Sequence, residues 1–243
     1  PTGSWWWKAL VLGVLNIGAF FVLLFVAAYR HPGGVAATLG SIQPLISAGL
    51  AVPELGERLR TTTANAGGHS VIGDALLVLR ANATPDVVAV HPGLTGAVSM
   101  ATGVVLTKHW GRPVPLAAFT SWQLIAGGAL LVPIAFAVEG APPVPTTQNL
   151  IGFIWLATGG AAVSYLIWFR GVARLPVAQV SLLGLVSPVV ATIAGLVVLD
   201  QSLTPSQAIG AALILSAIWI GQRPTTEPAI PNPHQPTETK TQP

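Results

Sequence analysis

The two stretches that decide the fold are RHPGGVAATLGSIQPLISAGLAVPELGERL at residues 30–59 and RLPVAQVSLLGLVSPVVATIAGLVVLDQSL at residues 174–203. Seven positions are identical between them at a constant spacing of 144 residues: Arg30/Arg174, Pro32/Pro176, Leu39/Leu183, Gly40/Gly184, Pro44/Pro188, Leu55/Leu199 and Leu59/Leu203. Each stretch is apolar and carries an interior proline. The sequence therefore predicts an internal duplication of the kind found in membrane carriers built from repeated helical bundles.

The composition indicates that lipid is the solvent of this chain. Hydrophobic residues make up 52% and charged residues only 8%, against about a quarter charged residues in soluble domains. The apolar residues fall in blocks close to the ~20 residues that a helix needs to cross a bilayer. Because stretches such as residues 9–28 are apolar almost throughout, we expect an all-α, polytopic transmembrane helical bundle and not a barrel.

Several function classes are disfavoured. The chain has no cysteine, so thiolate chemistry and thiolate metal sites are excluded. No phosphate-binding loop, HExxH motif or nucleophile–base pair occurs in the apolar blocks, so we expect no enzyme, no cofactor and no metal. The net charge is +3, but the basic residues stand singly at block ends, which indicates membrane topology and no nucleic acid. No removable signal peptide is expected.

The apolar blocks give seven to eight helices. Seven blocks are clear, at about residues 8–29, 33–52, 87–107, 114–138, 150–169, 176–199 and 208–220. The domains expected are a partial first repeat at 1–80, a second repeat of five helices at 86–222, and a disordered cytoplasmic tail at 223–243. The tail is rich in Pro, Thr and Gln and lacks apolar periodicity.

Residues 61–80 are the weakest block. Asn65, His69 and Asp74 interrupt it, and a buried Asp costs roughly 2.5–3.5 kcal/mol even on the lenient insertion scale. The 144-residue spacing nevertheless places this block opposite residues 205–224, which form a credible last helix. We therefore predict a degenerate or poorly inserted helix, and we interpret His69 and Asp74, five residues apart, as evidence against clean insertion.

The distribution of Lys and Arg predicts the orientation. In the second half the basic residues mark alternate loops, at Lys108, Arg112, Arg170, Arg174 and Arg223, while the intervening loops carry Glu139 and Asp200. The positive-inside rule then places the C-terminus in the cytoplasm. If residues 61–80 cross the membrane, five spans separate the first block from its counterpart at 150–169. The two copies are then inverted, which favours alternating access, whereas four spans would make them parallel.

Three segments resemble a known family. They are LGVLNIGAFFVLLFVAAYRHPGGVAATLGSIQPLISAGLA at 12–51, KHWGRPVPLAAFTSWQLIAGG at 108–128 and YLIWFRGVARLPVAQVSLLGLVSPVVATIAGLVVLDQSLTPSQAIGAALILSAI at 165–218. The chain resembles EamA-type carriers of the drug/metabolite transporter superfamily, most closely the branch associated with pigment export. The resemblance covers most of residues 9–222. It departs from the family at residues 61–80 and at Asp200-Gln201, where a Gly-Glu pair is usual.

The resemblance implies ten helices in two inverted sets of five, of which two would precede Trp5. It also implies a plasma-membrane secondary transporter that exports a small organic metabolite without ATP. The alternative is a non-transporting or truncated remnant of such a carrier. The expected partners are a small-molecule substrate and the lipid bilayer, and a homodimer stays open.

Polar residues within the blocks are the candidates for a substrate pathway, because an unpartnered polar group in hydrocarbon is costly. Gln43 and Pro44 are matched 144 residues later by Ser187 and Pro188, which predicts two broken helices that meet near the midplane. The alternative is a packing kink. Asn16 lies a third of the way into its block, where it faces either the cavity or a neighbouring helix through a hydrogen bond.

Two further pairs complete the candidates. Trp122 and Gln123 lie near the middle of the 114–138 block, away from the interfacial belt where Trp is usually found, so a planar wall for a substrate competes with simple packing. Ser164 and Tyr165 offer hydroxyl groups to a substrate or to a neighbouring helix, with a slight preference for the neighbour.

Overall fold

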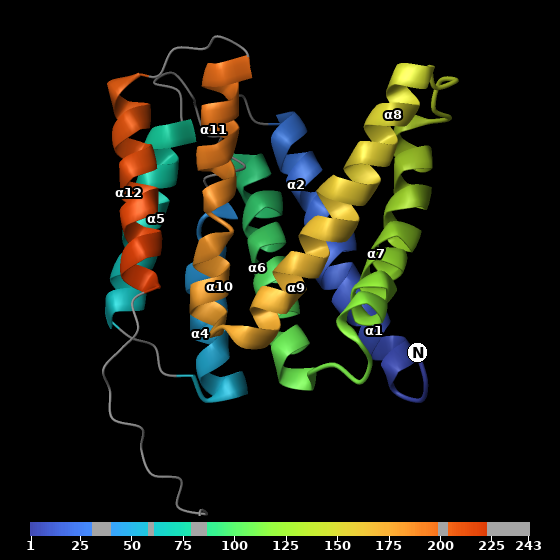
Figure 1. The fold of residues 1–243 in the computed structure, drawn as a ribbon, viewed down its shortest axis with the longest axis horizontal. Coiled ribbons are helices and arrows are strands. Elements are labelled where there is room, and N and C mark those ends of the chain that lie inside the picture. Colours follow the sequence, from blue (N-terminus) through green and yellow to red (C-terminus); the bar gives the residue numbers. More distant parts are fainter. Residues whose placement is uncertain (31–39, 58–60, 79–86, 199–203, 223–243) are drawn as a thin grey trace, which may run out of the picture.

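The structure, a computed structural model, describes residues 1–30, 40–57, 61–78, 87–198 and 204–222. Within these ranges the chain is helical and contains no strand, so the predicted all-α membrane fold is confirmed (Figure 1). Four helical segments of the described residues are long and apolar enough to cross a membrane: Trp5–Tyr29, Leu116–Glu139, Thr147–Arg174 and Val177–Val198. Pro205–Gly221 is a shorter apolar helix.

The helices follow the repeat that the sequence predicts. The first copy contains α1 (Trp5–Gly13), the π-helical segment η1 (Val14–Gly18), α2 (Ala19–Arg30), α4 (Gln43–Leu55) and α5 (Thr61–Val78). Next come α6 (Val87–Trp110) and α7 (Leu116–Glu139). The chain then continues through α8 (Thr147–Trp155), the π-helical segment η2 (Leu156–Val163), α9 (Ser164–Arg174), α10 (Val177–Leu183), α11 (Val186–Val198) and α12 (Pro205–Gly221).

Adding 144 to the bounds of the first copy reproduces the second copy. Residues 14–18 of η1 become 158–162, inside η2, and residues 61–78 of α5 become 205–222, which matches α12. Residues 43–55 of α4 become 187–199, which matches α11. Even the π-helical segments coincide, so the duplication extends to local irregularities of the backbone and not only to apolar composition.

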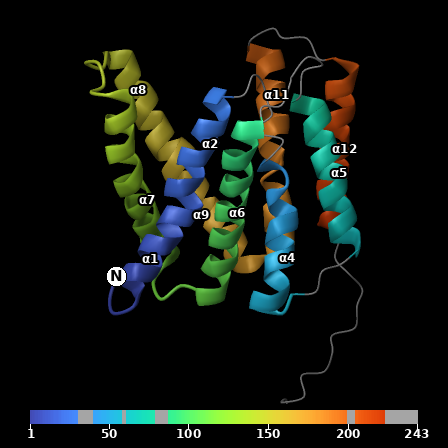
Figure 2. The same cartoon turned by 180° about the vertical axis from the view of Figure 1, so that it is seen from behind.

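The two copies run in opposite directions. In Figure 1, α1 and α2 rise from the N-terminus toward the top of the bundle, whereas η2 and α9 descend from α8 at the top. The view from behind in Figure 2 shows the same opposition between α4 and α11, of which one leads down and the other up. The predicted inverted relation between the copies is therefore present in the fold.

Helices α5 and α12 pack closely and antiparallel. A Cβ atom added at Gly73 would lie 2.8 Å from the carbonyl oxygen of Gly210, and one added at Gly210 would lie 2.5 Å from the carbonyl oxygen of Gly73. At the other end of the pair, Gly221 lies near Ala66. Small residues let the two backbones touch, which is a common way for helices to associate in lipid.

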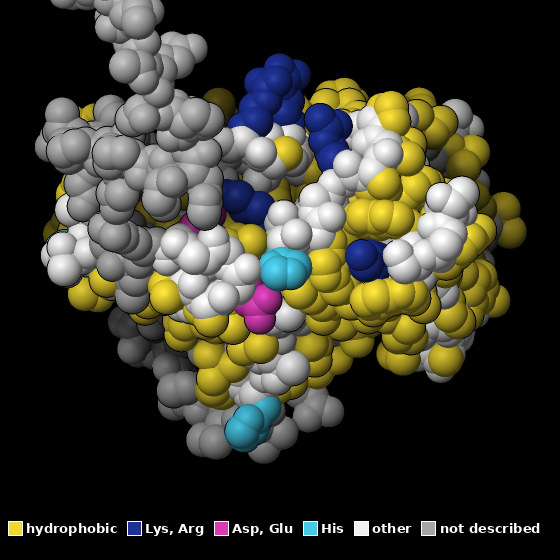
Figure 3. All heavy atoms as spheres, turned by 90° about the horizontal axis from the view of Figure 1, so that it is seen from below, with side chains coloured by type: hydrophobic (Ala, Val, Ile, Leu, Met, Phe, Trp, Pro, Cys, Tyr) yellow, Lys and Arg dark blue, Asp and Glu magenta, His cyan; other side chains and the backbone are white. Residues whose placement is uncertain are grey.

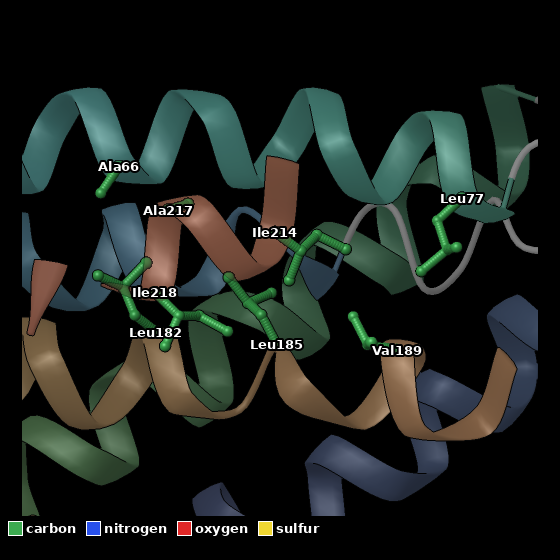
Figure 4. Close-up of a cluster of buried hydrophobic side chains, with 8 residues drawn as sticks. All are labelled: Ala66, Leu77, Leu182, Leu185, Val189, Ile214, Ala217 and Ile218. Carbon is green, nitrogen blue, oxygen red and sulfur yellow. The ribbon is translucent and has the colours of Figure 1, made fainter. Parts of the chain in front are cut away.

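An apolar cluster joins this helix pair to the broken helix α10–α11. Figure 4 shows side chains from α5, from α12 and from the α10–α11 region pointing toward one another. The cluster consists of Ala66, Leu77, Leu182, Leu185, Val189, Ile214, Ala217 and Ile218. Equivalent elements of the two copies thus share one core, because α5 and α12 occupy the same position in the repeat.

A second apolar cluster lies toward the lower end of Figure 1 and joins α4, α6, α9 and α10. It consists of Ala51, Val104, Val105, Phe169, Val172, Val177 and Val180. Below it the helices carry basic side chains, and Figure 3 shows Lys and Arg on this face. We call this the basic end of the bundle; its described residues include Lys8, Lys108, Arg112 and Arg174.

One feature differs from the sequence prediction and one stays a prediction. Residues 61–78, expected to be a degenerate or poorly inserted helix, form a helix against α12, where glycines and alanines allow the close contact, and this helix is not among the four that are long and apolar enough to cross a membrane. The predicted kink at Pro44 lies slightly earlier, at Ser41 and Ile42, and Pro44 occupies the first turn of α4, where a missing N–H costs nothing. Arg58, Arg80, Asp200, Gln201 and the 223–243 tail lie outside the described residues.

Gly210→Ala should destabilise the bundle by about 1–3 kcal/mol, because the new methyl group would press against the α5 backbone. Gly68→Ala is the matched control, since a Cβ atom at Gly68 in α5 meets nothing within 4 Å. Thermal unfolding in detergent, followed by tryptophan fluorescence, should show a lower midpoint for Gly210→Ala only. Equal midpoints for the two variants would contradict the close contact.

Candidate substrate-binding site

A cavity of about 500 Å³ lies near mid-depth in the bundle, where Ala97 and Met100 mark the middle of α6. Among the described residues, seven helices and the two breaks contribute to its wall. The lining residues are Phe20, Leu24, Gly40, Ser41, Gln43, Asp74, Ala97, Met100, Ser164, Tyr165, Trp168, Ser181, Gly184, Leu185, Ser187 and Pro188. The wall is therefore mostly apolar with a few polar groups, as is usual for small-molecule sites.

Equivalent positions of the two copies line the cavity. Ten of its lining residues form five pairs separated by 144 positions: Phe20/Ser164, Leu24/Trp168, Gly40/Gly184, Ser41/Leu185 and Gln43/Ser187. Equivalent positions face the same space, although most of the paired side chains differ in chemistry. The duplicated backbone thus forms the cavity, and the differences between the copies determine what its wall presents.

The two helix breaks occur at nearly equivalent positions of the copies, and both contribute irregular backbone to the cavity wall. In the second copy, Gly184 and Leu185 separate α10 from α11, and the backbone there tightens into i→i−3 hydrogen bonds. In a regular helix the carbonyl of Gly184 would accept from the N–H of residue 188, but Pro188 has none. The N–H of Ser187 donates to this carbonyl instead, at 3.2 Å. Such irregular backbone at membrane depth is tolerated where it lines a cavity.

Gln43 connects the two copies across this space. Its Nε2 atom donates to Ser47 Oγ at 2.9 Å, one turn along α4, and to Ser181 Oγ at 3.4 Å on α10. Ser181 is buried and is not among the predicted pathway residues. Gln43 therefore holds the start of α4 against α10 while it also lines the cavity.

The structure brings five of the nine predicted pathway residues to the cavity wall. They are Gln43, Ser164, Tyr165, Ser187 and Pro188. Pro44 is buried behind the wall, and Asn16, Trp122 and Gln123 are not among the lining residues. The part that each plays in transport stays a prediction, but the geometry separates residues that face the cavity from those that pack elsewhere.

Asn16 and Gln123 form a buried contact between helices. Asn16 Nδ2 donates to Gln123 Oε1 at 2.8 Å and to Thr107 Oγ1 at 3.1 Å, which ties η1 to α7 and α6. Gly103 makes room for it, since a Cβ atom there would collide with the Asn16 side chain. The arrangement matches the alternative interpretation of Asn16, an interhelical hydrogen bond.

Four lining residues, Ser41, Asp74, Trp168 and Ser181, carry polar groups and are not among the predicted pathway residues. Trp168 and Ser181 lie in apolar runs that give no indication of which side faces inward. Asp74 was noticed but was interpreted as a defect of its helix. An acidic residue inside an otherwise apolar span is by default a sign of function, and that signal was available in the sequence.

The described residues contain no cluster of three or more His, Asp or Glu side chains that could hold a metal ion. The basic end, in contrast, contains a network that connects the copies. Lys108 Nζ donates to Glu57 Oε1 at 2.7 Å and to the carbonyl oxygen of Leu175 at 2.7 Å, and the N–H of Val177 donates to Glu57 Oε2 at 3.0 Å. Glu57 thus joins the end of α4 to α6 and to the start of α10.

Comparison with known proteins identifies the family. The model of the EamA-like transporter family matches residues 1–79 and 89–221, which is most of the chain. The chain belongs to the EamA-like transporter family. Protein PecM of Dickeya dadantii is 41% identical over 227 residues, which cover 91% of this chain and 75% of PecM. The family resemblance inferred from the sequence is therefore correct.

Two further relatives of this EamA-family chain carry descriptive names. A probable terminal-alkyne amino-acid exporter of Streptantibioticus cattleyicolor is 27% identical, over 88% of this chain and 72% of its own length. A probable amino-acid metabolite efflux pump of Salmonella typhimurium is 26% identical, over 87% and 75%. A crystal structure also superposes with a TM-score of 0.76 at 20% identity, over 89% of this chain and 76% of that one, which shows a shared fold.

Gln123→Ala should destabilise this EamA-family protein by about 1–3 kcal/mol, because it leaves the buried Asn16 amide with one partner fewer. Ser121→Ala is the matched control on the same helix: Ser121 is exposed and bonds only to the carbonyl of its own turn, at Ala117. Thermal unfolding should separate the two variants. An unchanged midpoint for Gln123→Ala would remove the proposed structural role.

Proposed function

We propose that this EamA-family protein is a secondary carrier that exports a small organic metabolite across the plasma membrane by alternating access. The observation that carries the proposal is the cavity of about 500 Å³ whose wall is built from equivalent positions of two inverted copies. A site between inverted repeats is reached from either side when one copy rocks against the other.

The names of the relatives support export. The probable amino-acid metabolite efflux pump and the probable terminal-alkyne amino-acid exporter are both similar to this chain over more than four fifths of its length. No nucleotide-binding loop occurs in the sequence, so an ion or substrate gradient would supply the free energy. The membrane itself is the partner of the exposed apolar side chains of α8 and η2, among them Phe153, Ile154 and Trp155.

The proposal assigns the basic end to the cytoplasm. Lys8, Lys108, Arg112 and Arg174 lie at this end, and α12 ends there as well, so the residues after it are also cytoplasmic. Lys8 lies over the indole rings of Trp5 and Trp110 at 5.1 and 5.5 Å, an aromatic and cationic pair suited to the headgroup region.

The same end is closed. Phe169 follows Tyr165 by one turn toward the basic end, and Val104 follows Met100 in the same way. The second apolar cluster therefore lies between the cavity and the basic end, and the Glu57–Lys108 contact lies beyond it. Substrate entry from the cytoplasm requires this contact to separate, which makes Glu57 a positioning residue of the closed state.

Gln43→Ala should lower the exchange rate about threefold to tenfold, because it removes a polar group of the wall and its bond to α10. The measurement is counterflow of a panel of labelled amino acids and aromatic metabolites into proteoliposomes that contain the full chain. Gln148→Ala, on the exposed start of α8, is the matched control. Trp122→Ala, run in parallel, tests the role predicted for that residue.

Absence of counterflow for every solute in the panel would contradict the carrier and favour the non-transporting remnant. Flux in the wild type that Gln43→Ala leaves unchanged would contradict the assignment of this cavity as the pathway while leaving transport itself in place.

Glu57→Ala should open the cavity toward the cytoplasm. The natural chain has no cysteine, so a single Ser187→Cys substitution reports access to the cavity without background labelling. In inverted membrane vesicles, a membrane-impermeant maleimide should label this cysteine about fivefold faster when Glu57 is Ala, because a partly buried charge-assisted network has been removed. Glu54→Ala, at an exposed site beside His109, is the control. Equal labelling rates would contradict the closed-state role of Glu57.

A further inference from the structure

Asp74 is a buried carboxylate on the cavity wall with no partner. It lies on α5, its side chain is 1% exposed, and neither of its oxygens has a hydrogen-bond partner among the described residues. His69, on the same helix, is exposed and bonds to the carbonyl of Asn65 in its own helix. His69 and Asp74 therefore lie in different environments, and of the two only Asp74 lines the cavity.

The neighbouring helices offer no counter-ion to Asp74. Helix α5 packs against α12, α10, α11 and α4. The ranges of α10, α11 and α12 contain no Lys, Arg, His, Asp or Glu, and α4 carries only Glu54, which is exposed near its far end. None of the described lining residues of the cavity is Lys, Arg or His. A carboxylate that is buried without a partner is costly, so its complement has to come from outside the described chain.

The other lining residues indicate which kind of ligand could pair with Asp74. The indole N–H of Trp168 is also buried without a partner, and it lines the same cavity. Phe20, Leu24 and Leu185 provide apolar surface around these two polar groups. The site therefore offers one carboxylate, an indole N–H donor and several neutral hydroxyl groups beside aromatic and apolar surface, and the carboxylate is its one charged group among the described lining residues. Such a site suits a cation with an apolar body.

We infer that the cavity binds organic amines in their protonated form, with the ammonium group on the Asp74 carboxylate. The inference rests on the proposed function, since it names the substrate class of that site. An ammonium N–H donates to a carboxylate in a charge-assisted bond, the stronger kind of hydrogen bond, and supplies the partner that the described residues do not provide. A hydrogen-bond acceptor elsewhere on the amine would meet the Trp168 N–H.

The test is ligand binding by the purified full chain in detergent, with 2-phenylethylamine as the cationic probe and 2-phenylethanol as its neutral counterpart. Isothermal titration and the ligand-induced shift of the thermal midpoint are the two measurements. The wild type should bind the amine and bind the alcohol about tenfold or more weakly, because only the amine satisfies the carboxylate.

Asp74→Asn should lose the preference for the amine, and Asp74→Glu should retain part of it, because the charge is kept. Glu139→Gln, at the exposed end of α7, removes the same charge outside the cavity and should bind the amine as the wild type does. An unchanged elution profile and unchanged helical circular dichroism of Asp74→Asn establish that this variant is folded.

Three results would overturn the inference: no binding of the amine by the wild type, equal binding of amine and alcohol, or unchanged amine binding by Asp74→Asn. The last result would assign Asp74 to a proton or to structure. The proposed function fails separately, through the counterflow experiment. Amine binding without flux would leave this site in place and remove the carrier, and flux of neutral solutes without amine binding would do the reverse.

Discussion

The need to satisfy every backbone polar group inside the membrane is the constraint on which this structure depends. Continuous helices meet it within themselves, and a break leaves carbonyl and N–H groups that lipid cannot satisfy. In this chain the breaks occur at Ser41 and Ile42 in one copy and at Gly184 and Leu185 in the other. Three of these four residues line the cavity, as does Gly40, which precedes the first break. The helix breaks and the cavity therefore depend on each other, because broken backbone is tolerated at membrane depth only where it lines a cavity.

Polar side chains inside the bundle divide into two groups with different physical roles. The Asn16 amide on η1 donates to Thr107 on α6 and to Gln123 on α7, so these hydrogen bonds hold three helices together. Such bonds matter inside a membrane, where the hydrophobic effect does not drive helices together. Gln43 and Asp74 face the cavity instead. Gln43 satisfies its amide through two serine hydroxyls, whereas Asp74 has no partner among the described residues. The first group gives the bundle its rigidity, and the second gives the cavity its chemistry.

Two contacts between the copies differ in the same physical terms. At the basic end, an apolar cluster around Phe169 and the contacts of Glu57 with Lys108 and Val177 connect elements from both copies. This contact is polar, partly exposed and made by few groups, so it can separate and form again at modest cost. The contact of α5 with α12 is of the opposite kind, with glycine backbones in direct contact and an apolar core beside them. The structure thus combines a fixed contact between the copies with one that is able to change.

The sequence by itself determined the all-helical membrane fold and the duplication, because apolar blocks and proline spacing are local signals. It left the inverted sense conditional on a crossing by residues 61–80, and the opposite directions of the equivalent helices in the tertiary structure decided it. The same spacing led to Gln43, Ser187 and Pro188, and position within a span led to Ser164 and Tyr165, all of which line the cavity. Only the tertiary structure decided that Asn16 and Gln123 bond to each other, that Trp122 is not on the wall, and that Asp74 is. A helix in lipid is apolar on almost every side, so its sequence carries no amphipathic pattern that fixes its rotation. The packing of neighbouring helices sets that rotation, and with it the side chains that reach the cavity.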